Sequence, residues 1–332
     1  MKKTILTGIK PTGRVHLGNY IGAIKPALHL AKSEELEPVY FVADYHGLTK
    51  IRDPQQMKEL SYGIAATWLA LGLDPQKSIF YRQSDVPEIF ELSWILACLS
   101  PKGQMNRAHA YKAIVDRNDE VGREKDEGVN MGLFTYPILM ASDILLFQAN
   151  LVPVGKDQIQ HVEIARNLAE SFNHQFGETF ALPDYVVDES SMVLPGLDGR
   201  KMSKSYNNTI PLFEEPGKLK KLINRIKTDS SLPDEPKHPD QSVVFALYRE
   251  FVSDAELENM KKRYEQGIGW GDAKKELFSV MNHFLEEPRK RYNHYLSETG
   301  ELDRILDEGA RKARAKAQPL LQDIKRKLGI RL

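Results

Sequence analysis

The stretch TILTGIKPTGRVHLGNY, residues Thr4–Tyr20, begins as an apolar run and ends at the start of a helix. Its first part, Thr4–Gly8, lacks the polar alternation of a half-exposed strand, so we expect a strand buried on both faces. Strand–helix alternation continues along the first half of the chain and predicts a doubly wound parallel sheet of the Rossmann-like α/β class. The further expected strands are Val39–Ala43, Ser78–Tyr81 and Leu151–Val154, and the expected helices are Gly18–Lys32, Gln55–Leu73, Glu88–Leu99 and Gln158–Phe172.

Two segments in the middle of the chain are less regular. Residues Val115–Asn130, VDRNDEVGREKDEGVN, are polar, mixed in charge and aperiodic, which predicts a mobile surface loop to which we assign no role. The apolar segment GLFTYPILMASDILLF that follows predicts a helix with Pro137 in its first turn, where proline is tolerated.

The character of the chain changes after Asn207, where strand patterns end and helical patterns continue. We therefore predict two domains, residues 1–206 with the Rossmann-like sheet and residues 207–332 as an all-helical domain. The last helix is a candidate to pack back on the first domain. Pro319 is expected to kink or restart this helix. The expected helices of this half are Gly217–Lys227, Ser242–Phe251, Asp254–Gln266, Asp272–Glu298 and Glu301–Leu328.

Composition excludes several classes of protein. The chain contains 46 Lys and Arg against 46 Asp and Glu, so it has no global basic field for non-specific binding of nucleic acid. A single cysteine, Cys98, excludes internal disulfides and multi-cysteine metal sites and is typical of a reducing compartment. The N-terminal apolar run ends at Gly8, too early for an export signal, and no run approaches a membrane span in length. We therefore expect a cytoplasmic protein.

The turn between the first strand and the first helix offers a site for anions, because ligands of open α/β sheets bind beyond the carboxyl ends of the strands. Gly8 and Gly13 permit close approach of the backbone, and Gly18 and Asn19 open a helix whose free N–H groups favour phosphate. His16 adds a donor two residues before that helix. Taken alone, the turn is explained equally well as a Gly-containing connection whose histidine binds backbone.

A second motif, KMSKS at Lys201–Ser205, lies in a glycine-flanked loop directly after Arg200. Its lysines, Lys201 and Lys204, suit a leaving pyrophosphate, on which negative charge grows in the transition state. An exposed basic loop is the alternative interpretation. The string is more specific than most because it occurs together with the His-x-Gly-Asn turn.

Together, HLGN and KMSKS resemble the two signatures of the class I aminoacyl-tRNA synthetases, with Asn19 in place of the final histidine of the first signature. The segment FTYPILMASDILLFQANLVPVGKDQIQHVEIARNLAESFN, with ADYHGLTKIRDP and ELDRILDEGARKARAKA, resembles the bacterial tryptophanyl-tRNA synthetases over essentially the whole chain. The resemblance implies activation of tryptophan by ATP and Mg²⁺ to tryptophanyl-adenylate and pyrophosphate, then transfer to the 3′ end of a tRNA. It also implies an anticodon-reading helical half and a symmetric homodimer.

By the same resemblance, Asp143 would accept the indole N–H, Tyr136 and Gln158 would hold the α-amino group, and Met140 would line the indole pocket. Tyr136, Met140 and Asp143 also share one helix face by their spacing. An aspartate on an apolar face must be paired or solvated, and pairing with a purely structural donor is the alternative. The remaining tryptophan-site candidates are Gly8 and His46, and the ATP-site candidates are Lys10, Pro11, Thr12, His16, Gly18, Asn19, Gly155, Lys156, Asp157, Met192, Lys201, Met202, Ser203, Lys204 and Ser205.

The resemblance gives finer roles to a few positions. Asp157 would point to the ribose of ATP, and the backbone of Met192 would contact adenine. Lys112 would be the mobile ATP-binding lysine, with Arg107 as its rival. Lys10 and Leu6 depart from the usual glutamine and aromatic residue of the family. The catalytic candidates are Lys201, Lys204, His16 and Lys112.

Other interpretations remain open at this stage. A tyrosine-specific synthetase would need partners for a phenol hydroxyl in the pocket. A small nucleotidyltransferase shares the His-x-Gly turn but neither KMSKS nor the helical half, and a silent paralogue would bind tryptophan or RNA as a sensor. The dimer interface is expected within residues 100–150, with apolar surface near Pro137–Phe147. The basic run ARKARAKA, Ala310–Ala317, predicts a solvated helix face, with contact to RNA phosphate as the sharper alternative.

Overall fold

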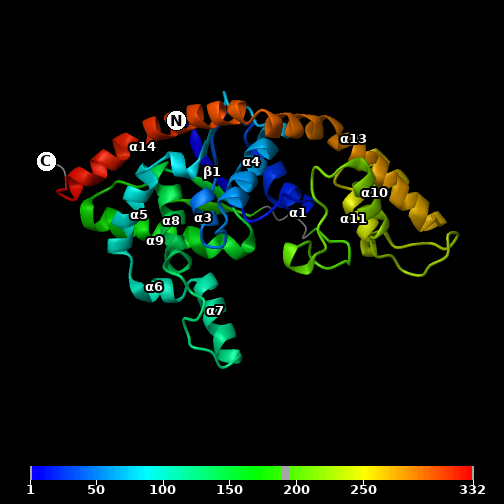
Figure 1. Cartoon of the computed structure of the whole chain (residues 1–332), viewed down its shortest axis with the longest axis horizontal. Helices are drawn as coiled ribbons and strands as arrows, with labels where there is room; N and C mark the ends of the chain where they lie inside the picture. Colours follow the sequence, from blue (N-terminus) through cyan, green and yellow to red (C-terminus); the bar gives the residue numbers. More distant parts are fainter. Residues whose placement is uncertain (1, 188–193, 331–332) are drawn as a thin grey trace.

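A computed structural model describes residues 2–187 and 194–330 of the chain. The described residues form a five-stranded sheet in the order β3-β2-β1-β4-β5, and each neighbouring pair of strands is parallel. Helices lie on both faces of this sheet (Figure 1), which confirms the predicted doubly wound, Rossmann-like α/β fold. The strands are β1 (Lys3–Ile9), β2 (Leu36–Val42), β3 (Ile79–Arg82), β4 (Leu151–Pro153) and β5 (Asp184–Val186).

The four strands expected from continuous apolar runs are all present, each within a few residues of its predicted bounds. The sequence interpretation missed β5, which has three residues and pairs with β4 at the edge of the sheet. Two of its residues, Asp184 and Tyr185, are exposed. Such a short, exposed edge strand leaves no apolar run to detect.

The helices of the first half begin at local capping signals. The Asp53 carboxylate accepts a hydrogen bond from the Gln56 N–H at 2.7 Å and caps α4. A π-helical turn, Tyr20–Ile24, joins α1 to α2, so the predicted first helix is interrupted by a wider turn. These helices are α1 (Leu17–Asn19), α2 (Lys25–Leu30), α3 (Asp44–Gly47), α4 (Pro54–Ala70), α5 (Glu88–Leu99), α6 (Lys102–Asn106), α7 (His109–Glu120), α8 (Met131–Leu146) and α9 (Ile159–Phe176).

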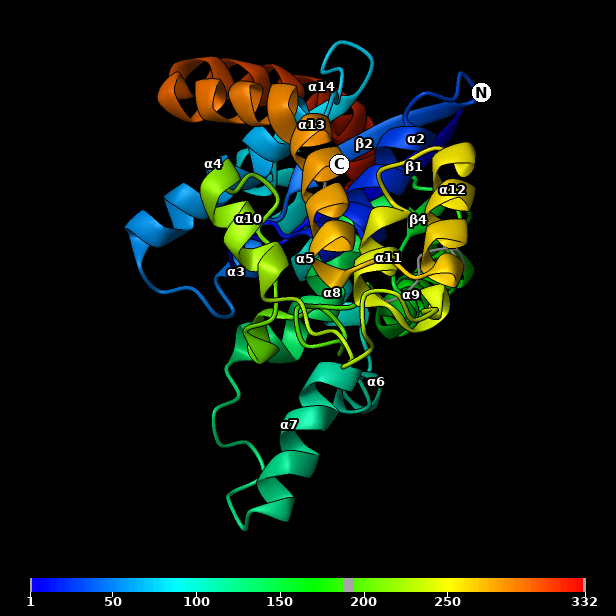
Figure 2. The same cartoon turned by 90° about the vertical axis from the view of Figure 1, so that its right-hand side faces the viewer.

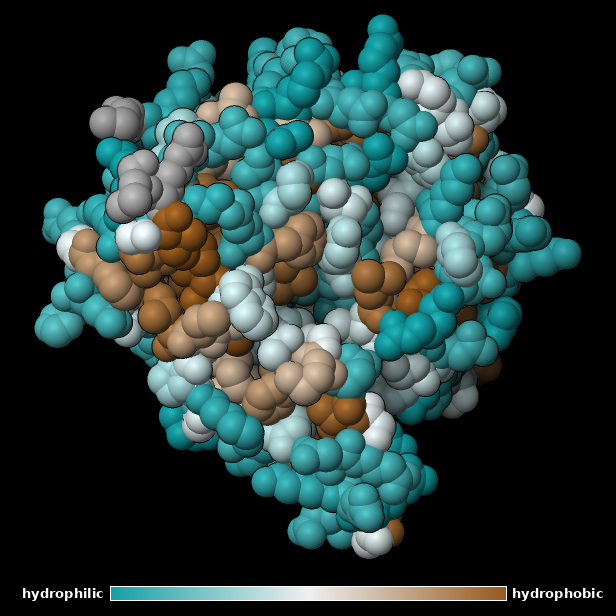
Figure 3. Space-filling view, turned by 60° about the vertical axis from the view of Figure 1, so that its left-hand side comes forward, coloured by the Kyte–Doolittle hydropathy of each residue, from teal (hydrophilic) through white to brown (hydrophobic). Residues whose placement is uncertain are grey.

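The predicted loop Val115–Asn130 is wrong for its first six residues, which belong to helix α7. The returning segment holds this helix in place: Asn118 donates to the Lys125 and Glu127 carbonyls at 3.2 and 2.9 Å, and the Tyr111 hydroxyl donates to Asp126 at 2.7 Å. The helix is mainly polar and is held by tertiary hydrogen bonds, which a search for apolar runs does not detect. α7 projects from the body of the molecule (Figures 1 and 2) as a largely hydrophilic arm (Figure 3).

The prediction for Pro137 is also wrong. Helix α8 begins at Met131 because the Asn130 side chain accepts the Leu133 N–H at 2.9 Å, which places Pro137 inside the helix rather than in its first turn. Most of the segment Pro137–Phe147 is buried within the chain, against α5 and α9. It therefore does not supply the exposed apolar surface expected for a dimer interface.

The second half of the described chain is helical, as predicted. The last helix runs through Pro319 without a break, so it is not restarted there. A capping box between Ser253 and Glu256 begins α12 at its predicted residue. The helices are α10 (Pro216–Asn224), α11 (Val243–Tyr248), α12 (Asp254–Gln266), α13 (Trp270–Ser297) and α14 (Thr299–Lys327).

Helix α14 lies across the sheet-containing half and packs on the edge strand β3 (Figure 1). The two backbones are so close that a Cβ at Gly309 would stand 1.7 Å from the Phe80 carbonyl oxygen, so only glycine fits there. Arg314 donates to Glu88 at 3.0 Å, and Lys316 pairs with Glu37. The basic run Ala310–Ala317 is therefore not simply a solvated face, because two of its cations attach α14 to the sheet-containing half.

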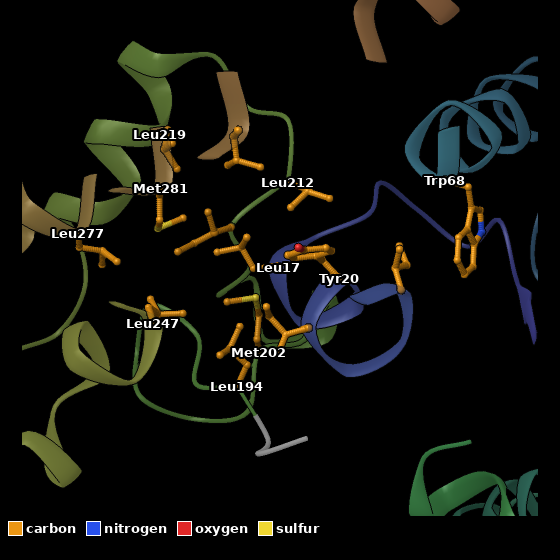
Figure 4. Packing of buried hydrophobic residues seen from close by; sticks show 14 of the residues in the cluster. Leu17, Tyr20, Trp68, Leu194, Met202, Leu212, Leu219, Leu247, Leu277 and Met281 are labelled. Carbon is orange, nitrogen blue, oxygen red and sulfur yellow. The ribbon is translucent and has the colours of Figure 1, made fainter. Parts of the chain in front are cut away.

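The apolar core does not stop at the predicted domain boundary. One cluster contains Leu17 and Tyr20 from the first turn, Met202 from the KMSKS loop, and Leu277 and Met281 from α13 (Figure 4). Residues from both halves thus share one core, and the division at residue 206 stays a prediction.

Candidate active site

From β1 the chain adds β2 and β3 on one side of the sheet, and it later adds β4 and β5 on the other side. β1 and β4 therefore form the topological switch point of the sheet. Crevices at such a switch point, beyond the carboxyl ends of the strands, are where open α/β sheets bind ligands. The turn Lys10–Gly18 follows β1, and the segment Gly155–Gln158 follows β4. The two predicted nucleotide-binding segments therefore leave the sheet side by side.

His16 and Asn19 cap each other at the start of α1. The His16 Nδ1 accepts the Asn19 N–H at 3.3 Å, and the Asn19 Oδ1 accepts the His16 N–H at 3.2 Å. Burial, followed by the Lys204 ammonium, lowers the pKa of His16 to about 4. The neutral ring therefore carries its proton on Nε2, which is the nitrogen left to donate to a ligand. Asn19, the departure from the first family signature, replaces a ring by an amide that completes the cap.

The KMSKS loop packs directly on this turn. The Gly18 N–H points to the Met202 sulfur at 3.3 Å, and Met202 is buried in the core beside Leu17 (Figure 4). The Lys204 Nζ stands 2.9 Å from the place where a Cβ of Gly13 would lie. Met202 thus anchors the loop, and the residues around it remain open to a ligand: Lys201, Ser203, Lys204 and Ser205 are half-buried or exposed.

Asn208, which the sequence analysis did not include, holds the KMSKS loop in place through side-chain hydrogen bonds. Its side chain is buried, accepts the Ser203 N–H at 2.8 Å, and donates to the Lys201 carbonyl at 3.1 Å and to Asp198 at 2.6 Å. Asn208 and then Arg200 lower the pKa of Asp198 to about 2. One amide therefore sets the course of the backbone on both sides of Met202.

Asp143 lies on the inner face of α8 and is fully buried. Its Oδ2 accepts from His46 Nε2 at 2.8 Å, and Gln83 Nε2 donates to Oδ1 and Oδ2 at 2.8 and 3.0 Å. Burial raises the pKa of Asp143, and the hydrogen bonds from His46 and Gln83 oppose that rise. The predicted residue Asp143 is thus a paired acceptor, and predicted His46 is one of its partners.

Tyr136 lies two turns before Asp143 on the same helix, with half-buried Met140 between them. The Tyr136 hydroxyl and His161 Nε2 are hydrogen-bonded at 2.5 Å. Burial lowers the pKa of His161 to about 4, so this ring is neutral at pH 7. Lys10 stands over the Tyr136 ring at 5.1 Å, and burial, then Lys50, lowers the pKa of its ammonium. The structure therefore brings Lys10, the departure from glutamine, to the tryptophan candidates.

Several other predicted residues lie around the same switch point. Gly8 is exposed at the end of β1, and a Cβ there would stand 2.3 Å from the Phe41 ring. Gln158 donates to Asp157 at 3.0 Å. A Cβ at Gly155 would come within 2.8 Å of the Asp157 carboxylate. Buried Pro11, half-buried Thr12 and exposed Lys156 complete this group.

The candidates for the mobile ATP-binding lysine are not brought to this group. Lys112 is exposed on α7, the projecting arm of Figure 1, and its rival Arg107 ends α6 with its carbonyl on Gln160. Met192 lies outside the described residues. The residues of this candidate site that the sequence analysis did not include are Gln83, Asn208 and His161.

Comparison with known proteins decides the family. The model for tRNA synthetases class I (W and Y) matches residues 2–286. The chain belongs to this family. It is 51% identical to a tryptophan–tRNA ligase of Neisseria meningitidis over 99% of this chain and 98% of that protein. It is also 51% identical to a tryptophan–tRNA ligase of Pseudomonas aeruginosa, over 100% of this chain and 75% of that protein.

A solved structure of the family has the same fold over nearly the whole chain. Tryptophanyl-tRNA synthetase of Campylobacter jejuni, complexed with ADP and tryptophan, matches with a TM-score of 0.89 at 44% identity, covering 98% of this chain and 99% of that chain. The resemblance drawn from HLGN and KMSKS is therefore confirmed, and a small nucleotidyltransferase is excluded. Because the family includes both tryptophan and tyrosine enzymes, the residues of the site must account for the choice of amino acid.

Proposed function

We propose that this chain is a tryptophan–tRNA ligase. A carboxylate oxygen of tryptophan attacks the α-phosphorus of ATP, the bond to the β-phosphate breaks, and pyrophosphate leaves. A hydroxyl of the terminal tRNA ribose then attacks the acyl carbon of the adenylate, and AMP leaves. Neither step needs a protein nucleophile, so the residues act by positioning and by stabilising charge.

The tryptophan–tRNA ligases that match nearly the whole chain support tryptophan as the amino acid, and the buried carboxylate of Asp143 supports a side chain that donates a hydrogen bond. His46 and Gln83 take three of the acceptor positions of its two oxygens and fix the carboxylate on the face of α8 that also carries Tyr136 and Met140. A carboxylate offers about four such positions, so one acceptor is left for an indole N–H. A phenol hydroxyl can satisfy the same acceptor, but an amino acid without a donor leaves it unpaired, at a cost of about 1–3 kcal/mol.

The ATP end of the site is supported by the contact between the two signature segments. His16 presents a neutral Nε2–H, and Lys204 reaches the glycine turn at Gly13. Lys201 and Lys204 are the groups that neutralise the pyrophosphate as it leaves. The described residues include no group of three or more His, Cys, Asp or Glu with metal-binding geometry. We propose that Mg²⁺ enters as the counter-ion of the ATP phosphates.

The partners follow from this function. The helical half, 207–332, is proposed to read the anticodon, and the sheet-containing half, 1–206, to bind ATP and tryptophan. We also propose a symmetric homodimer in the cytoplasm. No helix within the described part of the chain is long and apolar enough to cross a membrane.

Pyrophosphate exchange with ATP, measured with each of the twenty amino acids, tests the proposal. We expect exchange with tryptophan far above all others. Exchange with tyrosine in place of tryptophan would overturn the specificity, and exchange with none would overturn the reaction. Lys204→Met should lower kcat of exchange, whereas Lys218→Met, at an exposed lysine of α10, should leave it unchanged.

A further inference from the structure

The turn Gln83–Asp85 follows β3 and contacts Asp143 through Gln83. Gln83 in this turn is fully buried, and its amide nitrogen reaches both oxygens of Asp143. The next residue, Ser84, binds Asp44 through its N–H at 3.0 Å and its hydroxyl at 2.5 Å. Asp44 begins α3, the short helix that also carries His46. Both partners of Asp143 are thus tied to each other through Ser84 and Asp44.

The turn is also linked to helix α14 by the ion pairs of Arg82 with Asp303 and Asp307, which we call the clamp. Arg82, the last residue of β3, donates from Nε to Asp85 at 2.7 Å, from Nη1 to Asp303 at 2.8 Å and from Nη2 to Asp307 at 3.2 Å. A guanidinium held by carboxylates on its separate nitrogens has little freedom to turn. One peptide bond separates this fixed arginine from Gln83.

The clamp has a second support from helix α4. The Tyr62 hydroxyl donates to both oxygens of Asp303, at 2.9 and 3.0 Å. The close packing of Gly309 on Phe80 fixes the register of α14 against β3 six residues further along. Asp303 is therefore held where it meets Arg82, rather than being a mobile surface carboxylate.

We propose that Arg82 and Asp303 are positioning residues for amino-acid recognition: the clamp from α14 fixes the turn that holds Gln83 on Asp143. The proposal rests on the proposed function, because it takes Asp143 as the acceptor of the indole N–H. If the turn shifts, Gln83 loses its two contacts and Asp143 keeps only His46. A helix of the C-terminal half thereby takes part in selecting the amino acid without touching it.

The test separates positioning from plain stability. Asp303→Asn keeps the shape and weakens the ion pair, and Tyr62→Phe removes only the phenol hydrogen bond. Arg314→Gln is the matched control, because it breaks another ion pair between α14 and the sheet-containing half, to Glu88 on α5. The Michaelis constants for tryptophan and ATP in pyrophosphate exchange are measured for each variant, with the melting temperature.

We expect Asp303→Asn to raise KM for tryptophan about fivefold, Tyr62→Phe to raise it about twofold, and KM for ATP to stay within twofold in both. A merely unstable variant loses active enzyme and hence kcat, but its KM for tryptophan stays that of the wild type. Equal KM values for tryptophan in Asp303→Asn and Arg314→Gln would overturn the positioning role. If the wild type itself shows no tryptophan-dependent exchange, the proposed function fails, which is a separate outcome.

Discussion

Replacing Asp143 by asparagine gives a sharp test of the tryptophan site, because the side chain keeps its shape and loses its charge. Asp143 accepts three hydrogen bonds from His46 and Gln83 and leaves room for one more. The Gln83 Oε1 is buried and has no partner among the described residues, so Gln83 can rotate its amide to accept the new NH₂ group. We therefore expect the fold to tolerate the substitution.

Binding of tryptophan should suffer more than the fold. A hydrogen bond to a charged acceptor contributes about 1.5–3 kcal/mol, against about 0.5–1.5 kcal/mol for a neutral one. The loss of about 1.5 kcal/mol corresponds to a rise of roughly tenfold in KM for tryptophan. The KM for ATP should not change, because the ATP candidates lie at the other end of the site.

A tryptophan analogue with sulfur in place of the indole N–H completes the assay. The wild type should bind this analogue weakly, and Asp143→Asn should weaken it no further, because the analogue makes no hydrogen bond to lose. Pyrophosphate exchange with both amino acids, wild type and variant, gives the four constants. An equal rise of KM for tryptophan and for the analogue would refute the assignment of Asp143 to the indole nitrogen.

Three further outcomes are expected. Asn208→Ala removes the bonds that order the KMSKS loop and should lower kcat of exchange about tenfold at unchanged KM for tryptophan; a change in KM for tryptophan alone would contradict this role. His16 should stay neutral in the folded protein down to pH 5 in an NMR titration, because burial and then Lys204 lower its pKa to about 4. The unfolded chain protonates His16 below about pH 6.5. The contribution of His16 to the free energy of unfolding is therefore lost as pH falls from about 6.5 to 4. A His16 ring that titrates near 6.5 in the folded protein would contradict this expectation. Gly309→Ala should lower the free energy of unfolding in urea by about 2–3 kcal/mol, because its Cβ meets the Phe80 carbonyl; Gly300→Ala, where nothing lies within 4 Å, is the control and should change little.

The sheet was predictable because its central strands are continuous apolar runs bounded by glycine and polar residues. Most helices were predictable from spacing and caps, and α12 has its predicted bounds through the Ser253 capping box. β5 and α7 were not, since each is stabilised by tertiary contacts to residues that carry no local pattern. Asn118, for example, orders α7 through carbonyls of a segment that returns to it.

Residues of the candidate site could be predicted only where the resemblance to the family names them. His16 and Lys204 belong to the signature strings, and the structure brings them together. Gln83 and Asn208 are single amides in ordinary polar segments, and their importance comes from burial beside Asp143 and beneath Met202. The only signal for Gln83 is its place directly after a buried strand, at the edge of the sheet where ligands bind.

The position of α14 against β3 also has a consequence for synthesis of the chain. β3 is an edge strand, and its open hydrogen-bonding side is a template for pairing with other chains until something covers it. The helix that covers it follows much later, with 221 positions between Arg82 and Asp303. At about 5–20 residues per second on the ribosome, roughly 10–40 seconds pass between the synthesis of β3 and the synthesis of the part of α14 that covers it. Nascent chains interrupted in that interval carry an exposed strand edge and are therefore the form of this protein that most needs a chaperone.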